Sequence, residues 1–178
     1  YTDMVRQQTD KFLFAIAVAA LLLVVSAFLV ARSQPEPVYQ SEGAPEGISH
    51  NYLLALRQRD FVRAYGYLSS YLEGYPDSAE AFEDLVLDHP WDFGIDEYSG
   101  GHLQVIATDV NGDRASVRVR ETSFHSDGLF DSRQTTHVFI MKLKRENGSW
   151  RIRHADNFWS PCLEEKSACE LTEPFYQQ

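Results

Sequence analysis

His154 and Asp156 are the residues of this sequence best placed for acid-base chemistry, because they stand two positions apart near the end of the last predicted strand. A histidine beside a carboxylate in a pocket can act as a general base. We therefore name both as candidate pocket residues. No nucleophile or metal-ligand spacing accompanies them, and a single inward histidine is commonly satisfied by a neighbouring hydroxyl or carbonyl. We expect no catalytic residue, no metal and no cofactor, and predict that the protein is not an enzyme.

The two cysteines, Cys162 and Cys169, both lie near the C-terminus. In an exported domain such a pair predicts a disulfide that closes a small loop, worth roughly 2.5 kcal/mol by chain entropy. Two free thiols or a partial metal site are the alternatives, and metal is disfavoured because there is no second CxxC motif and no histidine at ligand spacing nearby. We predict that residues 161–178 form a disulfide-looped tail.

Charged side chains suggest a second kind of site, an interaction surface. Nine acidic residues and no lysine or arginine lie between Glu73 and Glu97, whereas basic residues alternate along three later strands. Trp91 and Phe93 lie in the acidic stretch, and aromatic side chains commonly anchor interfaces. The simpler explanation of this charge separation is that both regions are ordinary solvated exterior. The functional explanation is docking, either on a partner's acidic surface or on a second copy of the chain. The candidate interface is Arg118, Arg120, Lys142, Lys144, Arg151, Arg153, Trp91 and Phe93.

Helices are predicted before the strands. Apolar residues recur at steps of three and four over residues 48–72, with a break at Arg59 where Asp60 can cap a second helix. Residues 78–87 give a shorter helix that the His89-Pro90 pair ends.

Four strands follow, at residues 102–110, 114–124, 136–145 and 150–159, where the apolar period becomes two. Asn111-Gly112 and Asn147-Gly148 predict tight hairpins, and Ser126-Asp127-Gly128 predicts a further turn. The alternation places Trp150, Ile152 and His154 on the apolar face. This pattern predicts an α+β fold, in which the helices pack on the apolar face of a curved antiparallel sheet of four or more strands.

Residues 12–31 carry no charge and are long enough, as a helix, to span a bilayer core. Arg6 and Lys11 precede this run and acidic residues follow it, so the positive-inside rule favours a cytoplasmic N-terminus. A cleaved signal peptide is the competing interpretation, but no A-x-A-like cleavage site follows. We predict a cytoplasmic tail at 1–11, a transmembrane helix at 12–32 and an extended, proline-containing linker at 33–47.

The chain has 178 residues and a net charge of −10, which leaves room for one ordinary domain beside the anchor. The first 32 residues hold three bases and two acids, so the negative charge lies in the remainder. This balance argues against nucleic acid as a partner.

The helix pair in YLLALRQRDFVRAYGYLS, the acidic helix and the strands that end in Trp150-Arg151-Ile152 resemble the nuclear-transport-factor-2-like superfamily. The resemblance covers residues 48–160 and implies a cone-shaped domain, a fold shared with ketosteroid isomerases. A membrane helix before such a domain is similar to the bridging subunit of type IV secretion machines and to lipid-transport-associated membrane proteins of actinobacteria. The isomerase site cannot be mapped onto particular positions of this sequence.

We therefore expect a single-pass, membrane-anchored, non-catalytic interaction domain outside the cytoplasm, which serves as an accessory or assembly subunit of a larger membrane complex. Its expected partners are the lipid bilayer and other subunits, and a homo-oligomer is possible. The alternative is a membrane-tethered domain whose cone binds or isomerises a small molecule. A binder needs a roomy cavity with convergent polar groups, whereas a scaffold fills its cone with apolar side chains.

Overall fold

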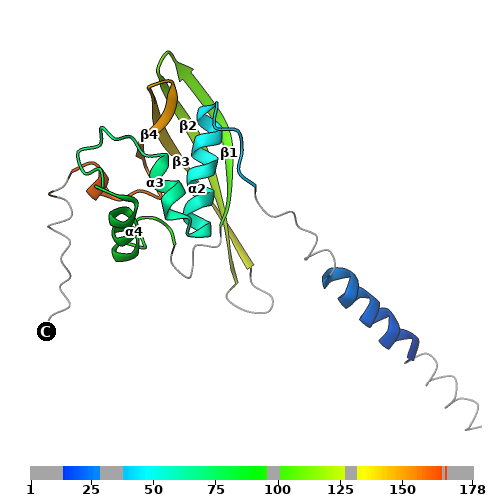
Figure 1. Cartoon of the computed structure of the whole chain (residues 1–178). Coiled ribbons are helices and arrows are strands. Elements are labelled where there is room, and N and C mark those ends of the chain that lie inside the picture. Colours follow the sequence, from blue (N-terminus) through cyan, green and yellow to red (C-terminus); the bar gives the residue numbers. More distant parts are fainter. Residues whose placement is uncertain (1–13, 29–37, 96–100, 127–131, 166, 168–178) are drawn as a thin grey trace, which may run out of the picture. The chain divides into compact units, whose positions relative to one another are not determined.

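The computed structural model of the chain describes residues 14–28, 38–95, 101–126, 132–165 and 167 (Figure 1). The chain divides into two compact units, Tyr1–Pro37 and Val38–Gln178. The described part of the first unit is one helix, residues 14–28, with exposed apolar side chains along its length. No helix among the described residues combines the length and the apolar character that crossing a membrane requires. The predicted span begins and ends outside the described residues and stays a prediction.

The second unit begins with two helices joined at the predicted break. Helix α2, Pro45–Gln58, ends at Arg59, whose φ of 56° is left-handed. Asp60 then caps helix α3, Phe61–Gly66, by accepting a hydrogen bond from the Arg63 N–H. The prediction of two helices is confirmed, but the second is shorter than expected. Residues 67–69 are not helical, because they pair with β4 of the sheet through a parallel bridge between Leu68 and Ile152.

Helix α4, Ala79–Asp88, matches its prediction closely. The Ser78 hydroxyl caps its start by accepting a hydrogen bond from the Ala81 N–H, and His89 ends it. Only Phe82 and Val86 of this helix are fully buried. The acidic side chains of the helix therefore remain on its exposed side.

The sheet is a four-stranded antiparallel meander in the order β1-β2-β3-β4. Its tight turns contain Gly112, Asn147 and Gly148, all with positive φ, as the two Asn-Gly pairs predict. The predicted Ser126 turn continues into residues 127–131, outside the described residues. Strand β3 is longer than predicted, and β4 ends four residues earlier than the predicted Trp159. The strands are β1 His102–Asn111, β2 Arg114–Ser126, β3 Ser132–Glu146 and β4 Ser149–Ala155.

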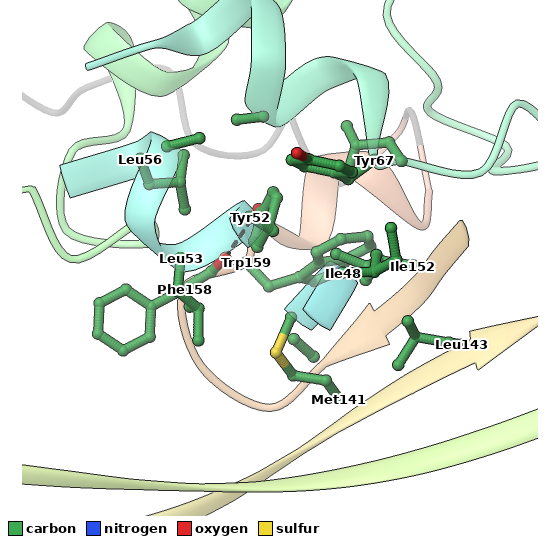
Figure 2. Close-up of a cluster of buried hydrophobic side chains, with 14 of the residues drawn as sticks. Ile48, Tyr52, Leu53, Leu56, Tyr67, Met141, Leu143, Ile152, Phe158 and Trp159 are labelled. Atoms are coloured by element: carbon green, nitrogen blue, oxygen red, sulfur yellow. Dashed lines mark hydrogen bonds between the residues drawn. The ribbon is translucent and has the colours of Figure 1, made fainter. Parts of the chain in front are cut away.

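The helices and one face of the sheet enclose the core (Figure 1). Side chains from β2, β3 and β4 are buried against α2 and α3, and Phe158 and Trp159 from the segment after β4 complete the cluster (Figure 2). Tyr52 is fully buried and donates a hydrogen bond to the Phe158 carbonyl at 3.0 Å. The α+β fold with helices over one antiparallel sheet is thus confirmed. The buried strand residues include Ala115, Val117, Val119, Phe139, Met141, Leu143, Trp150 and Ile152.

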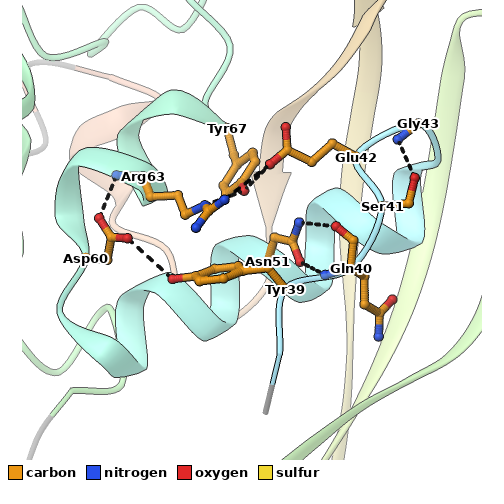
Figure 3. Close-up of polar contacts among 9 residues, drawn as sticks. All are labelled: Tyr39, Gln40, Ser41, Glu42, Gly43, Asn51, Asp60, Arg63 and Tyr67. Carbon is orange, nitrogen blue, oxygen red and sulfur yellow. Dashed lines mark hydrogen bonds and ion pairs between the residues drawn. The ribbon is translucent and has the colours of Figure 1, made fainter. Parts of the chain in front are cut away.

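Of the predicted linker 33–47, residues 45–47 already form the first turn of α2, so the predicted boundary at 47 is wrong. Val38–Ala44 packs on the domain, and we call it the N-terminal strap (Figure 3). The buried Asn51 side chain accepts from the Gln40 N–H at 2.7 Å and donates to the Gln40 carbonyl at 2.9 Å. Arg63 lies 3.7 Å from the centre of the Tyr39 ring, and the Tyr67 hydroxyl donates to Glu42. The chain from Val38 onward is therefore fixed to α2 and α3 rather than extended freely.

The segment after the sheet contains the 3-10 helix η1, Pro161–Leu163, in which Cys162 is buried. The Gly74 N–H donates to the Leu163 carbonyl, so this segment lies against the loop after α3. Cys169 lies outside the described residues. Its predicted pairing with Cys162 therefore stays a prediction.

Candidate functional site

The outer face of the sheet, opposite the helices, carries most of the predicted interface residues. Arg118, Arg120, Lys142 and Lys144 are all exposed, and they alternate with the buried Val117, Val119, Met141 and Leu143. Cross-strand pairing sets Ile140 beside Arg118 and Val138 beside Arg120. Val138 is 47% exposed. We call this surface the basic face: Arg118, Arg120, Lys142 and Lys144, with the apolar Val138 and Ile140.

The cations of this face form no direct ion pairs within the described part of the chain. Arg114 lies directly opposite Lys144 in the sheet, and like charges in that position repel. Among the described residues, none of the four cations of the basic face, nor Arg114, forms an ion pair. The chain as a whole has a net charge of −10, so this positively charged surface has the opposite sign to the chain's overall charge.

Arg151 and Arg153, the remaining predicted interface bases, are half-buried. Arg151 pairs with Lys144 across β3 and β4. Arg153 is held in place, because its Nη1 donates to Ser69 Oγ at 3.1 Å and to Glu146 Oε1 at 3.5 Å. The Glu146 side chain is only 8% exposed, so this pair lies partly out of water. Arg153 therefore acts as a fixed cation at the border of the basic face.

A cavity of about 410 Å³ lies at the hairpin end of the outer face. Strands β1 to β4 all contribute to its lining, and basic side chains outnumber acidic ones. The sequence gives the alternation of these bases, but the cavity depends on the register of all four strands. The lining residues are Asp109, Asn111, Arg114, Ala115, Ser116, Lys142, Leu143, Lys144 and Arg153.

The structure corrects the predicted position of His154. A bulge in β4 shifts the register, so that Ile152 pairs with Leu143 but His154 pairs with Lys142. Since paired residues share a face, His154 lies on the outer side and not with Trp150 and Ile152. Its side chain is 31% exposed. His154 and Asp156 therefore do not line the interior of the domain.

His154 lies between two carboxylates. Its Nε2 is 3.1 Å from Asp156 Oδ1, and its Nδ1 contacts Glu164 Oε1. Glu164 also accepts a hydrogen bond from the Trp159 indole at 2.9 Å. Glu164 is not among the predicted site residues, because its ten-residue separation from His154 follows no periodic pattern. This arrangement ties the segment around η1 to the edge of the sheet.

Asp156 directly follows the last paired residue of β4, Ala155, which lies opposite Met141 of β3. Its Oδ2 accepts from the Ile140 N–H at 3.0 Å. Partial burial acts to raise the pKa of Asp156, but the Ile140 N–H, His154 and Lys142 together lower it below its usual value. Asp156 is thus held as an anion, which suits a structural acceptor better than a proton shuttle.

The two predicted aromatic anchors differ in position. Trp91 is 71% exposed, as an anchor requires. Phe93 is fully buried and packs edge-on against Phe82, with ring centres 5.7 Å apart. The prediction that Phe93 lies at an interface is therefore wrong within this chain, because this aromatic belongs to the core.

Within the described ranges, no group of three or more His, Cys, Asp and Glu side chains has an arrangement that could hold a metal ion. The described acidic residues of the Glu73 to Glu97 stretch are mostly exposed and include four on α4. The domain thus presents an acidic helix and, on the far side of its core, the basic face.

No known protein family matches this chain, and no curated protein matches it. Solved structures with similar folds include a SEC-C motif containing protein from Rhodopseudomonas palustris, which is 16% identical, with a TM-score of 0.45 and coverage of 72% of this chain and 85% of that one. An NTF2-like protein with a cystatin-like fold from Novosphingobium aromaticivorans is 14% identical, with a TM-score of 0.43 and coverage of 62% and 75%. An NTF-2 like protein from Shewanella oneidensis is 13% identical, with a TM-score of 0.39 and coverage of 61% and 90%.

The structural neighbours of this α+β domain thus include NTF2-like and cystatin-like fold proteins. Since all three TM-scores lie below 0.5, nothing further is concluded from these likenesses.

Proposed function

We propose that this chain is a single-pass, membrane-anchored, non-catalytic interaction domain of the nuclear-transport-factor-2-like kind. In this proposal the N-terminus is cytoplasmic, the domain lies outside the cytoplasm, and the protein is an accessory or assembly subunit of a larger membrane complex. The basic face docks on an acidic surface of a partner subunit.

The observation that carries this proposal is the unpaired, two-stranded array of cations on the basic face. Arg118 and Arg120 lie on β2 beside Ile140 and Val138 on β3, so charge and exposed apolar surface are interleaved. A partner that covers this face would bury apolar area and neutralise the repulsion between the cations. Charge complementarity of this kind mainly sets the rate and the specificity of association.

The composition of the interior supports a scaffold over a domain that binds a small molecule inside its cone. Large side chains fill the space between α2 and the sheet, among them Tyr52, Phe139, Phe158 and Trp159. The titratable pair proposed for a pocket, His154 and Asp156, lies on the outer side, with contacts that fix the C-terminal segment. Replacing His154 with alanine should therefore leave assembly and activity of the complex intact.

Charge reversal tests the docking surface directly. We expect the double variant Arg118→Glu/Arg120→Glu to lose its partner subunit during purification in mild detergent, while the wild-type chain retains it. The matched control is Arg59→Glu/Arg133→Glu, which changes the net charge equally at two exposed positions away from the basic face.

Salt dependence gives a second readout in the same experiment. Raising the salt concentration from about 0.1 M to 1 M shortens the screening length from about 10 Å to about 3 Å, so wild-type association should weaken. Equal retention by both double variants at every salt concentration would refute docking through the basic face.

A further inference from the structure

The cavity of about 410 Å³ at the hairpin end of the sheet borders the basic face and extends beyond it to β1 and β4. Its volume lies in the lower part of the range for small-ligand pockets, roughly 300–1,000 Å³. Lys142 and Lys144 belong both to the basic face and to the cavity, whereas Arg118 and Arg120, whose charge reversal tests docking, are not among its lining residues. The cavity can therefore be tested separately.

Four cations converge on this cavity from three strands. Arg114 comes from β2, Lys142 and Lys144 from β3, and Arg153 from the bulge in β4. The register sets Arg114 directly opposite Lys144, a repulsive arrangement that a bound anion would relieve. Of these four cations, only Arg153 has an ion-pair partner among the described residues. A second carboxylate, Asp156, interacts with Lys142 electrostatically.

Arg153 distinguishes this cluster from an ordinary group of surface bases. Ser69 and Glu146 hold its Nη1, and Ser69 is itself fully buried. Among the described residues, the Nε and Nη2 donors of the guanidinium have no hydrogen-bond acceptor. A guanidinium fixed in this way can bind two oxygens of a planar or tetrahedral oxyanion with little further loss of conformational entropy.

The cavity also contains groups for a neutral part of a ligand. Ser116 can donate a hydrogen bond, Asn111 can donate and accept, and the carboxylate of Asp109 accepts from hydroxyl groups. Asp109 would repel an anion placed against it. A ligand that suits the whole lining therefore has its negative charge near the four bases and hydroxyl groups near Asp109.

We propose that this cavity binds the phosphate monoester of a small hydroxylated molecule. The phosphate lies between Arg153, Arg114 and the two lysines, and the hydroxylated body faces Asp109 and Asn111. The same chemistry occurs in a free sugar or polyol phosphate and in a phosphomonoester headgroup of a lipid.

Glycerol 3-phosphate is the probe for the first source. Titration calorimetry on the full chain, purified in a nonionic detergent, should give saturable binding to one site, whereas glycerol should give none. Arg114→Gln/Lys144→Gln changes two exposed lining residues and should weaken binding at least tenfold. Arg118→Gln/Arg120→Gln removes equal charge from the same face outside the cavity, and its affinity should stay within twofold of wild type.

A second variant keeps the test independent of folding. Arg153→Lys retains the positive charge beside the buried Glu146 but removes the planar fork, so it should fold and bind at least fivefold more weakly. Vesicles that contain phosphatidic acid test the lipid source in parallel. Binding to these vesicles alone, with the same dependence on Arg114 and Lys144, would assign the site to a headgroup.

The proposal is overturned by the absence of binding in both arms. Equal losses of affinity in the cavity variant and in the Arg118/Arg120 control would overturn it too, because they would indicate unspecific attraction. Neither outcome bears on docking, which the charge reversals at Arg118 and Arg120 test through partner retention.

Discussion

At the scale of single residues, the alternation from Trp150 to Ile152, before the bulge in β4, determines which of these side chains lie in the core. Ile152 is fully buried, whereas its neighbour Arg151 is half-buried beside Lys144. We predict that Ile152→Ala lowers the free energy of unfolding by about 2–5 kcal/mol and that Arg151→Ala changes it by less than about 0.5 kcal/mol. Urea denaturation measures both values. Similar losses at the two positions would mean that the strand has a different register.

The pKa of Asp156 gives a prediction about pH. Because its folded-state pKa lies below the ordinary value of 3.8, the charged form stabilises the fold above that value, and this contribution is lost as the pH falls through the folded-state pKa. Asp156→Asn keeps an acceptor for the Ile140 N–H but removes the charge. The variant should be less stable than wild type at pH 7, and the difference should shrink as the pH falls below 3.8 and through the folded-state pKa. A difference that is constant with pH in urea denaturation would contradict this account.

Several residue positions could not be predicted from the sequence. Alternation correctly placed Trp150 and Ile152, but the bulge before His154 reverses the face, and no residue type marks it in the sequence. Phe93 was assigned to an interface because acidic residues surround it, whereas packing against Phe82 decides its burial. Such contacts depend on residues far apart in the chain.

At the scale of elements, the N-terminal strap packs so closely on α2 that position 47 of the helix has no room for a side chain. A Cβ atom built on Gly47 would lie 1.9 Å from the Ser41 carbonyl oxygen, whereas one on Gly66 would meet nothing within 4 Å. We predict that Gly47→Ala costs about 1–3 kcal/mol, because either the strap or the helix must shift. Gly66→Ala should instead stabilise the domain by about 0.4–1 kcal/mol.

Thermal unfolding of the two alanine variants measures this contrast, and limited proteolysis should show earlier cleavage in the strap of the Gly47 variant. A stabilising Gly47→Ala change would mean that the strap does not pack on α2.

The sequence predicted the helices and hairpins well because caps and Asn-Gly turns are local signals. It assigned the strap to a free linker, since the partner that holds Gln40 is the distant Asn51.

At the scale of the whole molecule, the predicted anchor determines on which side of the membrane the domain lies. Ser41 is exposed, so the variant Ser41→Cys should react in intact cells with a membrane-impermeant maleimide. The wild-type chain, whose two cysteines are predicted to form a disulfide, gives the background. Reaction of the variant only after lysis would reverse the predicted topology.

The central claim is that the basic face docks on a partner, and site-specific photo-crosslinking in the native membrane tests it most directly. A photoreactive residue at Val138, 47% exposed beside Arg120, is compared with one at Val62, 68% exposed on α3. We predict a crosslinked partner from position 138 and none from position 62. The crosslink should disappear when Arg118→Glu/Arg120→Glu is added. Crosslinking from position 62 alone, or a crosslink at 138 that survives the charge reversal, would contradict docking through this face.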